Sequence, residues 1–141
     1  MRKSLMVVMA VALCGIAITA KAQQKAEVMA RQSAKQWLAI VDGGKYAQSW
    51  DEASQYLKSS ITKDKWAEDL SKARASLGSL KSRKLASAQY KKGLPNKPTA
   101  EYVVAVYNSA FQSMPSAAET VFLMRDQDGK WRVAGYLVKP K

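Results

Sequence analysis

The sequence has 141 residues and a formal net charge of +12, from 23 lysines and arginines against 11 aspartates and glutamates. It holds no histidine and one cysteine, Cys14. Histidine-dependent nucleophilic catalysis and zinc sites built from histidine and cysteine are therefore excluded by residue type. A site made of carboxylates alone would need acidic residues at ligand spacing, and the sequence shows no such motif, so we expect no metal and no cofactor.

The first 22 residues have the pattern of a secretory signal peptide. Two basic residues precede an apolar run over residues 5–18, and Ala20 and Ala22 supply the small residues of a cleavage site. We expect export to the periplasm or the medium, with cleavage before Gln23. The alternatives are a membrane anchor, for which the run is short, and a lipoprotein anchored through Cys14, which follows a bulky leucine.

Residues 23–141 are expected to form a single domain that begins with three helices. The first covers residues 25–41 and ends at a glycine pair, which suits a helix C-terminus. The second follows residue 45, and the third begins at Thr62, which can cap it. Their apolar stripes are Ala30, Ala34, Trp37, Leu38 and Val41 in the first helix, Tyr46, Trp50, Ala53 and Leu57 in the second, and Trp66, Leu70, Ala73 and Leu77 in the third.

After residue 81 the apolar period changes toward two, which predicts four antiparallel strands. They are expected at residues 82–90, 101–108, 119–125 and 130–138, with residues 113–116 breaking the chain before the third strand. The Asp-Gly pair that ends at Gly129 is typical of a hairpin turn. The register expected for this hairpin pairs Arg125 with Trp131, Leu123 with Val133 and Val121 with Gly135.

This order of elements predicts an α+β fold, with three N-terminal helices packed on one face of a curved four-stranded antiparallel meander sheet. An ordered set of short motifs spans most of the domain and resembles an exported bacterial family, the domain of unknown function 4019. The resemblance implies a fold and export but no activity. The order is also similar to cone-shaped folds of the nuclear transport factor 2-like and cystatin-like kinds. The motifs are residues 37–46, Ser49, Trp50, Trp66, Leu77, Gly78, Ser82, Arg83, Glu101, Tyr102, Glu119, Thr120 and residues 131–136.

A carboxylate on the apolar face of the last hairpin is the first candidate site. Glu119 should point to the same side as Val121 and Leu123, where it is either paired with an arginine such as Arg83 or desolvated with a raised pKa. One interpretation is a structural ion pair, and the other is a pocket acid or base assisted by tyrosine donors. The ligand-pocket candidates are Tyr107, Glu119, Trp131 and Tyr136.

The second candidate is a basic segment, because no acidic residue occurs between Asp69 and Glu101. A ridge of these cations would attract anionic envelope surfaces with a strong dependence on salt. The alternative is a solvated face that keeps the protein soluble. Nucleic acid is the least expected partner, since no aromatic ladder accompanies the lysines. The anion-binding candidates are Lys72, Arg74, Lys81, Arg83, Lys84, Lys91 and Lys92.

The other face of the last hairpin is predicted to be a mostly apolar strip, which favours a homodimer through the outer sheet face. Its members are Phe122, Met124, Ala134, Tyr136 and Val138. From these patterns we expect an exported, non-catalytic binding or interaction module whose ligand is unknown. The alternatives are a small-molecule enzyme that uses Glu119 and an electrostatic binder of envelope polyanions.

Overall fold

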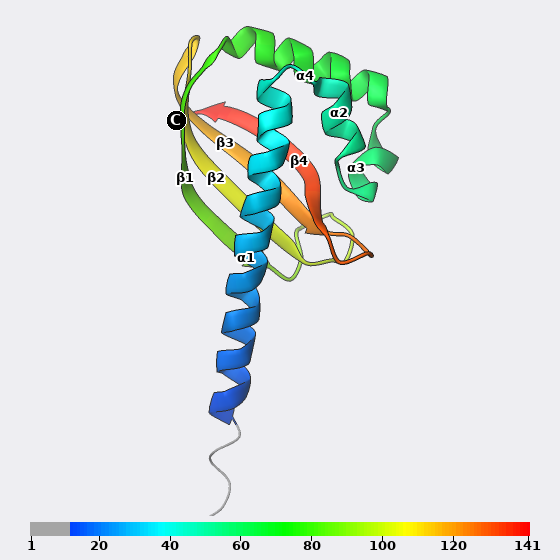
Figure 1. Ribbon diagram of the computed structural model, residues 1–141, viewed down its shortest axis with the longest axis vertical. Helices are drawn as coiled ribbons and strands as arrows, with labels where there is room; N and C mark the ends of the chain where they lie inside the picture. Colours follow the sequence, from blue (N-terminus) through cyan, green and yellow to red (C-terminus); the bar gives the residue numbers. More distant parts are fainter. Residues whose placement is uncertain (1–11) are drawn as a thin grey trace, which may run out of the picture.

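The computed structural model describes residues 12–141, and residues 1–11 of the expected signal peptide lie outside the described residues. The chain forms helices first and then a four-stranded antiparallel meander, which confirms the α+β prediction (Figure 1). The strand order is β1-β2-β3-β4, so β1 and β4 are the edges. The elements are α1 (Ala12–Asp42), α2 (Tyr46–Asp51), α3 (Gln55–Ser60), α4 (Lys63–Leu77), β1 (Leu80–Lys91), β2 (Tyr102–Phe111), β3 (Met114–Arg125) and β4 (Trp131–Pro140).

Helix α1 crosses one face of the curved sheet, which is called the inner face below (Figure 1). Its predicted apolar stripe is buried in full and joins the residues of the sheet in one core. The helix begins well before the predicted residue 25 and continues without a break through the predicted cleavage site. The buried stripe runs from Ala30 to Val41, so the C-terminal part of the helix packs on the sheet.

The second predicted helix is wrong as a single element, because it is two short helices separated at Ser54. This residue has extended backbone angles, and its side chain accepts a hydrogen bond from the N–H of Leu57, 3.2 Å away. Serine is a good helix cap and a poor interior residue. Its own N–H donates to the carbonyl of Val133 at 2.8 Å, which joins the start of α3 to the sheet.

Helix α4 begins at the predicted cap, where Thr62 accepts from the N–H of Lys65. Its buried residues differ from the predicted stripe, because Arg74 is buried and Ala73 is exposed, while Trp66 is only partly buried against the core. Arg74 lies one turn after Leu70 and therefore on the same side of the helix. Arg74 pairs there with the carboxylate of Asp42, at the C-terminal end of α1, at 2.9 Å.

Strand β3 is longer than predicted, because it begins at Met114 and runs through Pro115. Proline is tolerated there since the register with β2 is irregular between Ser109 and Phe111, and β4 pairs with β3 only from Ala117 onward. The predicted break at residues 113–116 is therefore wrong. The turn between the two strands is instead confined to the residues just before Met114.

The last hairpin contains a β-bulge that the predicted register lacked. Arg125 pairs with Trp131 and Leu123 with Val133 as predicted, but Phe122 pairs with Gly135 and Val121 with Tyr136. Ala134 is the extra residue, and a bulge of this kind inverts the alternation of every side chain after it. The prediction that Tyr136 and Val138 lie on the outer face is therefore wrong. Both pack against the core, and the Tyr136 ring lies 5.3 Å from that of Trp37.

Candidate ligand-binding site

Glu119 is fully buried on the inner face and accepts four hydrogen bonds. Arg83 donates from Nε at 2.5 Å and from Nη2 at 3.0 Å, and the Ser109 hydroxyl donates at 2.9 Å. The Tyr136 hydroxyl donates the fourth bond to Oε2. A carboxylate has about four lone-pair sites, so these donors take up the acceptor capacity of Glu119. Its role in the described structure is that of a structural ion pair.

The same network extends to the helices through Asp42, at the C-terminal end of α1. Arg83 donates two hydrogen bonds to Asp42, at 2.6 and 3.0 Å, and Arg74 of α4 donates a third at 2.9 Å. Two arginines therefore face two carboxylates, which leaves the cluster neutral. The cluster ties α1 and α4 to the sheet. The Arg74 guanidinium also stacks 5.2 Å from the centre of the Phe111 ring.

The pKa shifts of these groups follow from their partners. Burial alone would raise the pKa of Asp42, but its hydrogen bonds with Arg83 and Arg74 hold that pKa below the usual 3.8. Burial alone would lower the pKa of Arg83, and its bonds to the two carboxylates raise it instead. Burial and the neighbouring Glu119 charge raise the pKa of Tyr136 well above its usual range. Asp42, Arg83 and Tyr136 therefore each keep one protonation state near neutral pH.

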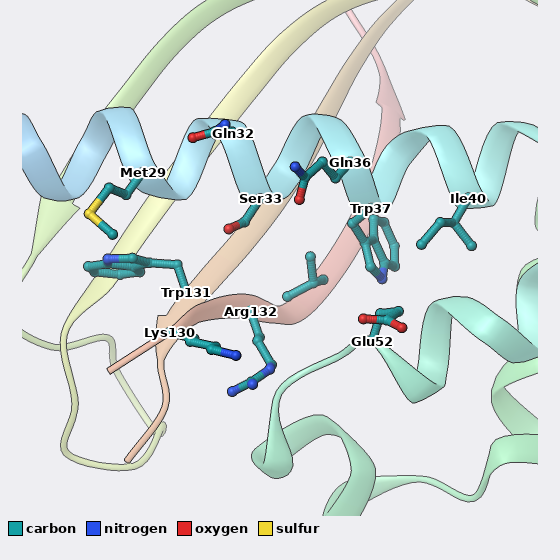
Figure 2. A pocket seen from close by; sticks show the side chains of 11 residues that line it. Met29, Gln32, Ser33, Gln36, Trp37, Ile40, Glu52, Lys130, Trp131 and Arg132 are labelled. Atoms are coloured by element: carbon teal, nitrogen blue, oxygen red, sulfur yellow. The ribbon is translucent and has the colours of Figure 1, made fainter. Parts of the chain in front are cut away.

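An open cleft of about 520 Å³ lies between α1 and the start of β4 (Figure 2). Its floor is apolar and is formed by the buried side chains of Trp37, Trp131 and Val133. The Trp37 indole is fixed because its N–H donates to the carbonyl of Ser49 at 2.9 Å. In Figure 2 the Met29 side chain points from α1 toward the Trp131 ring. The volume is in the range that holds small molecules in other proteins.

Polar side chains surround this apolar floor, and most of them have no hydrogen-bond partner within residues 12–141. The exception is Arg132, which pairs with Asp126 and Asp128. The indole N–H of Trp131 has no partner among the described residues either, and it is open to solvent, since it is not among the buried polar atoms without a partner. This N–H is therefore free to donate to a ligand in the cleft. The polar groups without such a partner are those of Gln32, Ser33, Gln36, Glu52 and Lys130.

The structure divides the four ligand-pocket candidates between two places. Glu119 and Tyr136 are bonded to each other inside the network, whereas Trp131 lies in the cleft at the other end of the hairpin. Tyr107 pairs with Glu119 across β2 and β3, and its side chain lines a separate groove between α1 and β1. The pocket of Glu119, Trp131 and tyrosines that the sequence suggested is therefore not one site.

Sequence reasoning did not find the α1 side of the cleft. Met29, Ser33, Gln36 and Ile40 follow one another at spacings of three and four, directly beside the predicted apolar stripe. Such a stripe of mixed polarity next to a core face is the signal that could have found it. Glu52 comes from the link between α2 and α3, and no local pattern places it there.

The anion-binding candidates also separate into two groups. Arg74 and Arg83 point into the fold, as described above, and Lys72 pairs with Glu68 at 2.5 Å on the surface of α4. The remaining lysines are exposed, on the edge strand β1 or just after it, and have no ion-pair partner in the described part of the chain. They are Lys81, Lys84, Lys91 and Lys92.

Over residues 12–141, no group of three or more acidic or cysteine side chains is placed to hold a metal ion. No helix in that part of the chain is long and apolar enough to cross a membrane.

Comparison with known proteins gives one match. The model of the family described as protein of unknown function (DUF4019) matches residues 33–136, which is most of the chain. No curated protein and no solved structure matches this sequence. The matched range begins inside α1 and ends at Tyr136, so it includes the buried network and the cleft residues other than Met29 and Gln32.

Proposed function

The chain belongs to the DUF4019 family, and we propose that it is an exported, single-domain, non-catalytic binding module that holds a small amphipathic molecule in the cleft between α1 and β4. The observation that carries this proposal is the combination of an apolar floor with unpartnered polar groups around it. Binding sites for small molecules in other proteins have this composition.

The absence of catalysis is proposed because of the state of Glu119. A general base needs a free lone pair within reach of a substrate proton, and a general acid needs a proton to donate. Glu119 is fully buried, and donors from three strands occupy its oxygens, namely Arg83 of β1, Ser109 of β2 and Tyr136 of β4. This argues against the alternative of an enzyme that uses this carboxylate.

The polar groups of the cleft favour a ligand that carries little net charge. Three of the unpartnered side chains, Gln32, Ser33 and Gln36, are neutral amides and a hydroxyl. The unpartnered charges are Glu52 and Lys130, which have opposite signs, and the Arg132 charge is balanced by two aspartates. A neutral or zwitterionic molecule with an apolar part complements this lining best.

The experiment titrates the protein with N-phenylnaphthylamine, a neutral apolar fluorescent probe with one polar N–H. Met29→Glu places a charge above Trp131 and should weaken binding at least about tenfold, since one buried unpaired charge costs more than 1.4 kcal/mol. The matched control is Val28→Glu. Val28 and Met29 are neighbours with similar exposure, 47% and 44%, but Val28 lines the opposite side of α1.

The control should bind the probe like the parent. An equal loss of affinity for the probe in both variants would contradict a ligand site in the cleft. So would a parent protein that does not bind the probe. Melting temperatures of both variants, followed by circular dichroism, should stay close to that of the parent because both positions are exposed.

An electrostatic binder of envelope polyanions remains a second candidate. The observation that favours it is the row of exposed lysines on the free edge of β1, including Lys81 and Lys84. The alternative is that these lysines only protect a sheet edge from pairing with another chain. If they bind polyanions, Lys81→Gln with Lys84→Gln should elute from heparin at lower salt than the parent. Identical elution would leave edge protection as their role.

A further inference from the structure

A second groove lies on the other side of α1, between this helix and the edge strand β1. Its volume is about 510 Å³. Helix α1 contributes Val28, Arg31, Lys35 and Leu38, whose spacings of three and four place them on one side of the helix. The sheet contributes Tyr107 and other residues from its inner face. Helix α1 stands between this groove and the cleft, and Gln32 is the one residue that lines both.

The walls of the groove are apolar. Leu85 of β1 pairs with Tyr107 of β2 across the sheet, and the two side chains face Leu38 of α1. Val28 extends this surface toward solvent and is one of only two large hydrophobic side chains that are exposed in the described part of the chain. An apolar side chain left at the mouth of a groove indicates a surface that an apolar ligand can cover.

The charges of the groove all have one sign. Arg31, Lys35 and Arg83 line it, and no carboxylate does so among its described residues. The Arg83 charge is balanced by Asp42 and Glu119. Arg31 and Lys35 have no ion-pair partner within the described residues and lie one helical turn apart, so one anionic group can contact both.

The Tyr107 hydroxyl also lines the groove. It makes no hydrogen bond with any described residue, and it is open to solvent, because Nη1 of Arg74 is the one buried side-chain polar atom without a partner among the described residues. A hydroxyl that is open to the groove can donate to an acceptor that enters it.

From this geometry we propose that the α1–β1 groove binds a single-chain carboxylate amphiphile of the fatty-acid type. The carboxylate lies between Arg31 and Lys35 and accepts a hydrogen bond from Tyr107. The acyl chain covers Val28, Leu38 and Leu85. Cations without ion-pair partners, an unpartnered hydroxyl open to the groove and apolar walls are the three features that a carboxylate with one alkyl chain complements.

The test is isothermal titration calorimetry with dodecanoate, kept below the concentration at which it forms micelles. The combined variant Arg31→Gln and Lys35→Gln should weaken binding at least about tenfold, because each hydrogen bond to a charged group is worth about 1.5–3 kcal/mol. The matched control, Lys81→Gln with Lys84→Gln, removes the same charge from the outside of the sheet edge and should bind dodecanoate like the parent. Tyr107→Phe keeps the ring and should weaken binding by a smaller factor.

Two other ligands test the two halves of the proposal. Acetate carries the carboxylate alone, and octyl glucoside carries an alkyl chain without charge, so each should bind at least about tenfold more weakly than dodecanoate. Failure of the parent to bind dodecanoate would overturn the proposal. So would equal weakening in the matched control, or binding of either fragment as tightly as dodecanoate.

Testing each of the two α1 variants, Val28→Glu and Met29→Glu, with both probes separates this proposal from the proposed function of the cleft. Val28→Glu should weaken dodecanoate and leave N-phenylnaphthylamine unchanged, whereas Met29→Glu should do the reverse. If both variants affect only one of the two probes, the groove and the cleft are not separate sites, and the further inference fails without affecting the cleft.

Discussion

The carboxylate of Glu119 is fully buried, and its charged partner is Arg83. Glu119→Gln removes the negative charge and leaves Arg83 buried with Asp42 as its only carboxylate. Breaking a buried pair in this way costs about 3–5 kcal/mol, so we expect a loss of that size in the free energy of unfolding measured with urea. The control is Glu68→Gln, whose pair with Lys72 is exposed and should be worth about 0–1 kcal/mol. A Glu119→Gln protein as stable as the parent would show that the network does not stabilise the fold.

The lowered pKa of Asp42 predicts how the free energy of unfolding changes at acidic pH. Its pKa is lower in the folded protein than its usual value of 3.8, so the unfolded chain binds the proton more readily. The stabilisation is therefore complete above pH 3.8 and is lost as the pH falls through the lower, folded pKa. We expect Asp42→Asn to be less stable than the parent near neutral pH, with a difference that shrinks below that value. Urea unfolding at a series of pH values measures this, and a difference that stays constant with pH would contradict it.

Individual residues show where sequence reasoning succeeds. The pairing of Arg83 with Glu119 could be proposed because a carboxylate on an apolar face needs a cation and Arg83 begins the sheet. The pairing of Arg74 with Asp42 could not, because 32 residues separate them and both lie at helix positions that look solvated in the sequence. The exposure of Ala73 and the burial of Arg74 follow from that missed partner, since hydrophobicity alone ranks the alanine as the core residue.

Among the elements, the bulge at Ala134 has the largest effect on what lies inside the fold. It turns Tyr136 toward Trp37 and Glu119, whereas a regular strand would turn it outward. Deleting Ala134 should restore the regular alternation and expose Tyr136. We expect a loss of about 3–5 kcal/mol in the free energy of unfolding, comparable to removing a buried aromatic side chain.

Tyr136→Phe is the comparison for that deletion. It keeps the ring in the core and removes only the hydroxyl that donates to Glu119, so it should cost about 1.5–3 kcal/mol. A deletion that costs no more than Tyr136→Phe would mean that the strand does not change its alternation. The measurement is urea unfolding followed by near-ultraviolet circular dichroism, which reports the packing of the tryptophans.

Helices and strands were predictable here to the extent that a local signal marks them. The cap at Thr62 and the turn at Gly129 are such signals, and both lie where expected. The bulge has no comparable signal, because Ala134 and Gly135 are compatible with a regular strand. The break at Ser54 was missed because an apolar stripe at helical spacing continues across it, while its cause is a hydrogen bond to Val133 in a distant strand.

For the whole molecule, the order of helices and strands could be read from the change in apolar period, and the structure confirms it. The cleft and the groove could not be predicted in this way. Each depends on the distance between α1 and an edge of the sheet, which the core side chains set together. The side chains between α1 and the sheet, such as Trp37 and Val121, set this distance and therefore the volumes of the cleft and the groove.

The expected signal peptide predicts the first residue, and therefore the mass, of the mature chain. Cleavage before Gln23 would remove the first part of α1 and leave the stripe from Ala30 to Val41 that is buried against the sheet. The intact mass of protein recovered from the envelope should therefore correspond to a chain that begins at Gln23. Ala22→Arg should prevent cleavage because the site requires a small residue there. Recovery of the parent at its full-length mass would contradict the prediction.

Helix α1 is a wall shared by both proposed sites, and its C-terminal end is fastened to the sheet and α4 through Asp42. A sideways tilt about that fastened end widens the space on one flank and narrows it on the other. Occupants of the two flanks should then oppose each other, and thermodynamic linkage requires that each lowers the affinity of the other by the same factor. Titrating dodecanoate with and without saturating N-phenylnaphthylamine, and the reverse, measures both factors. Unchanged affinities would show that α1 does not move. An equal loss of affinity for each ligand in the presence of the other would show that the position of α1 couples the two sites.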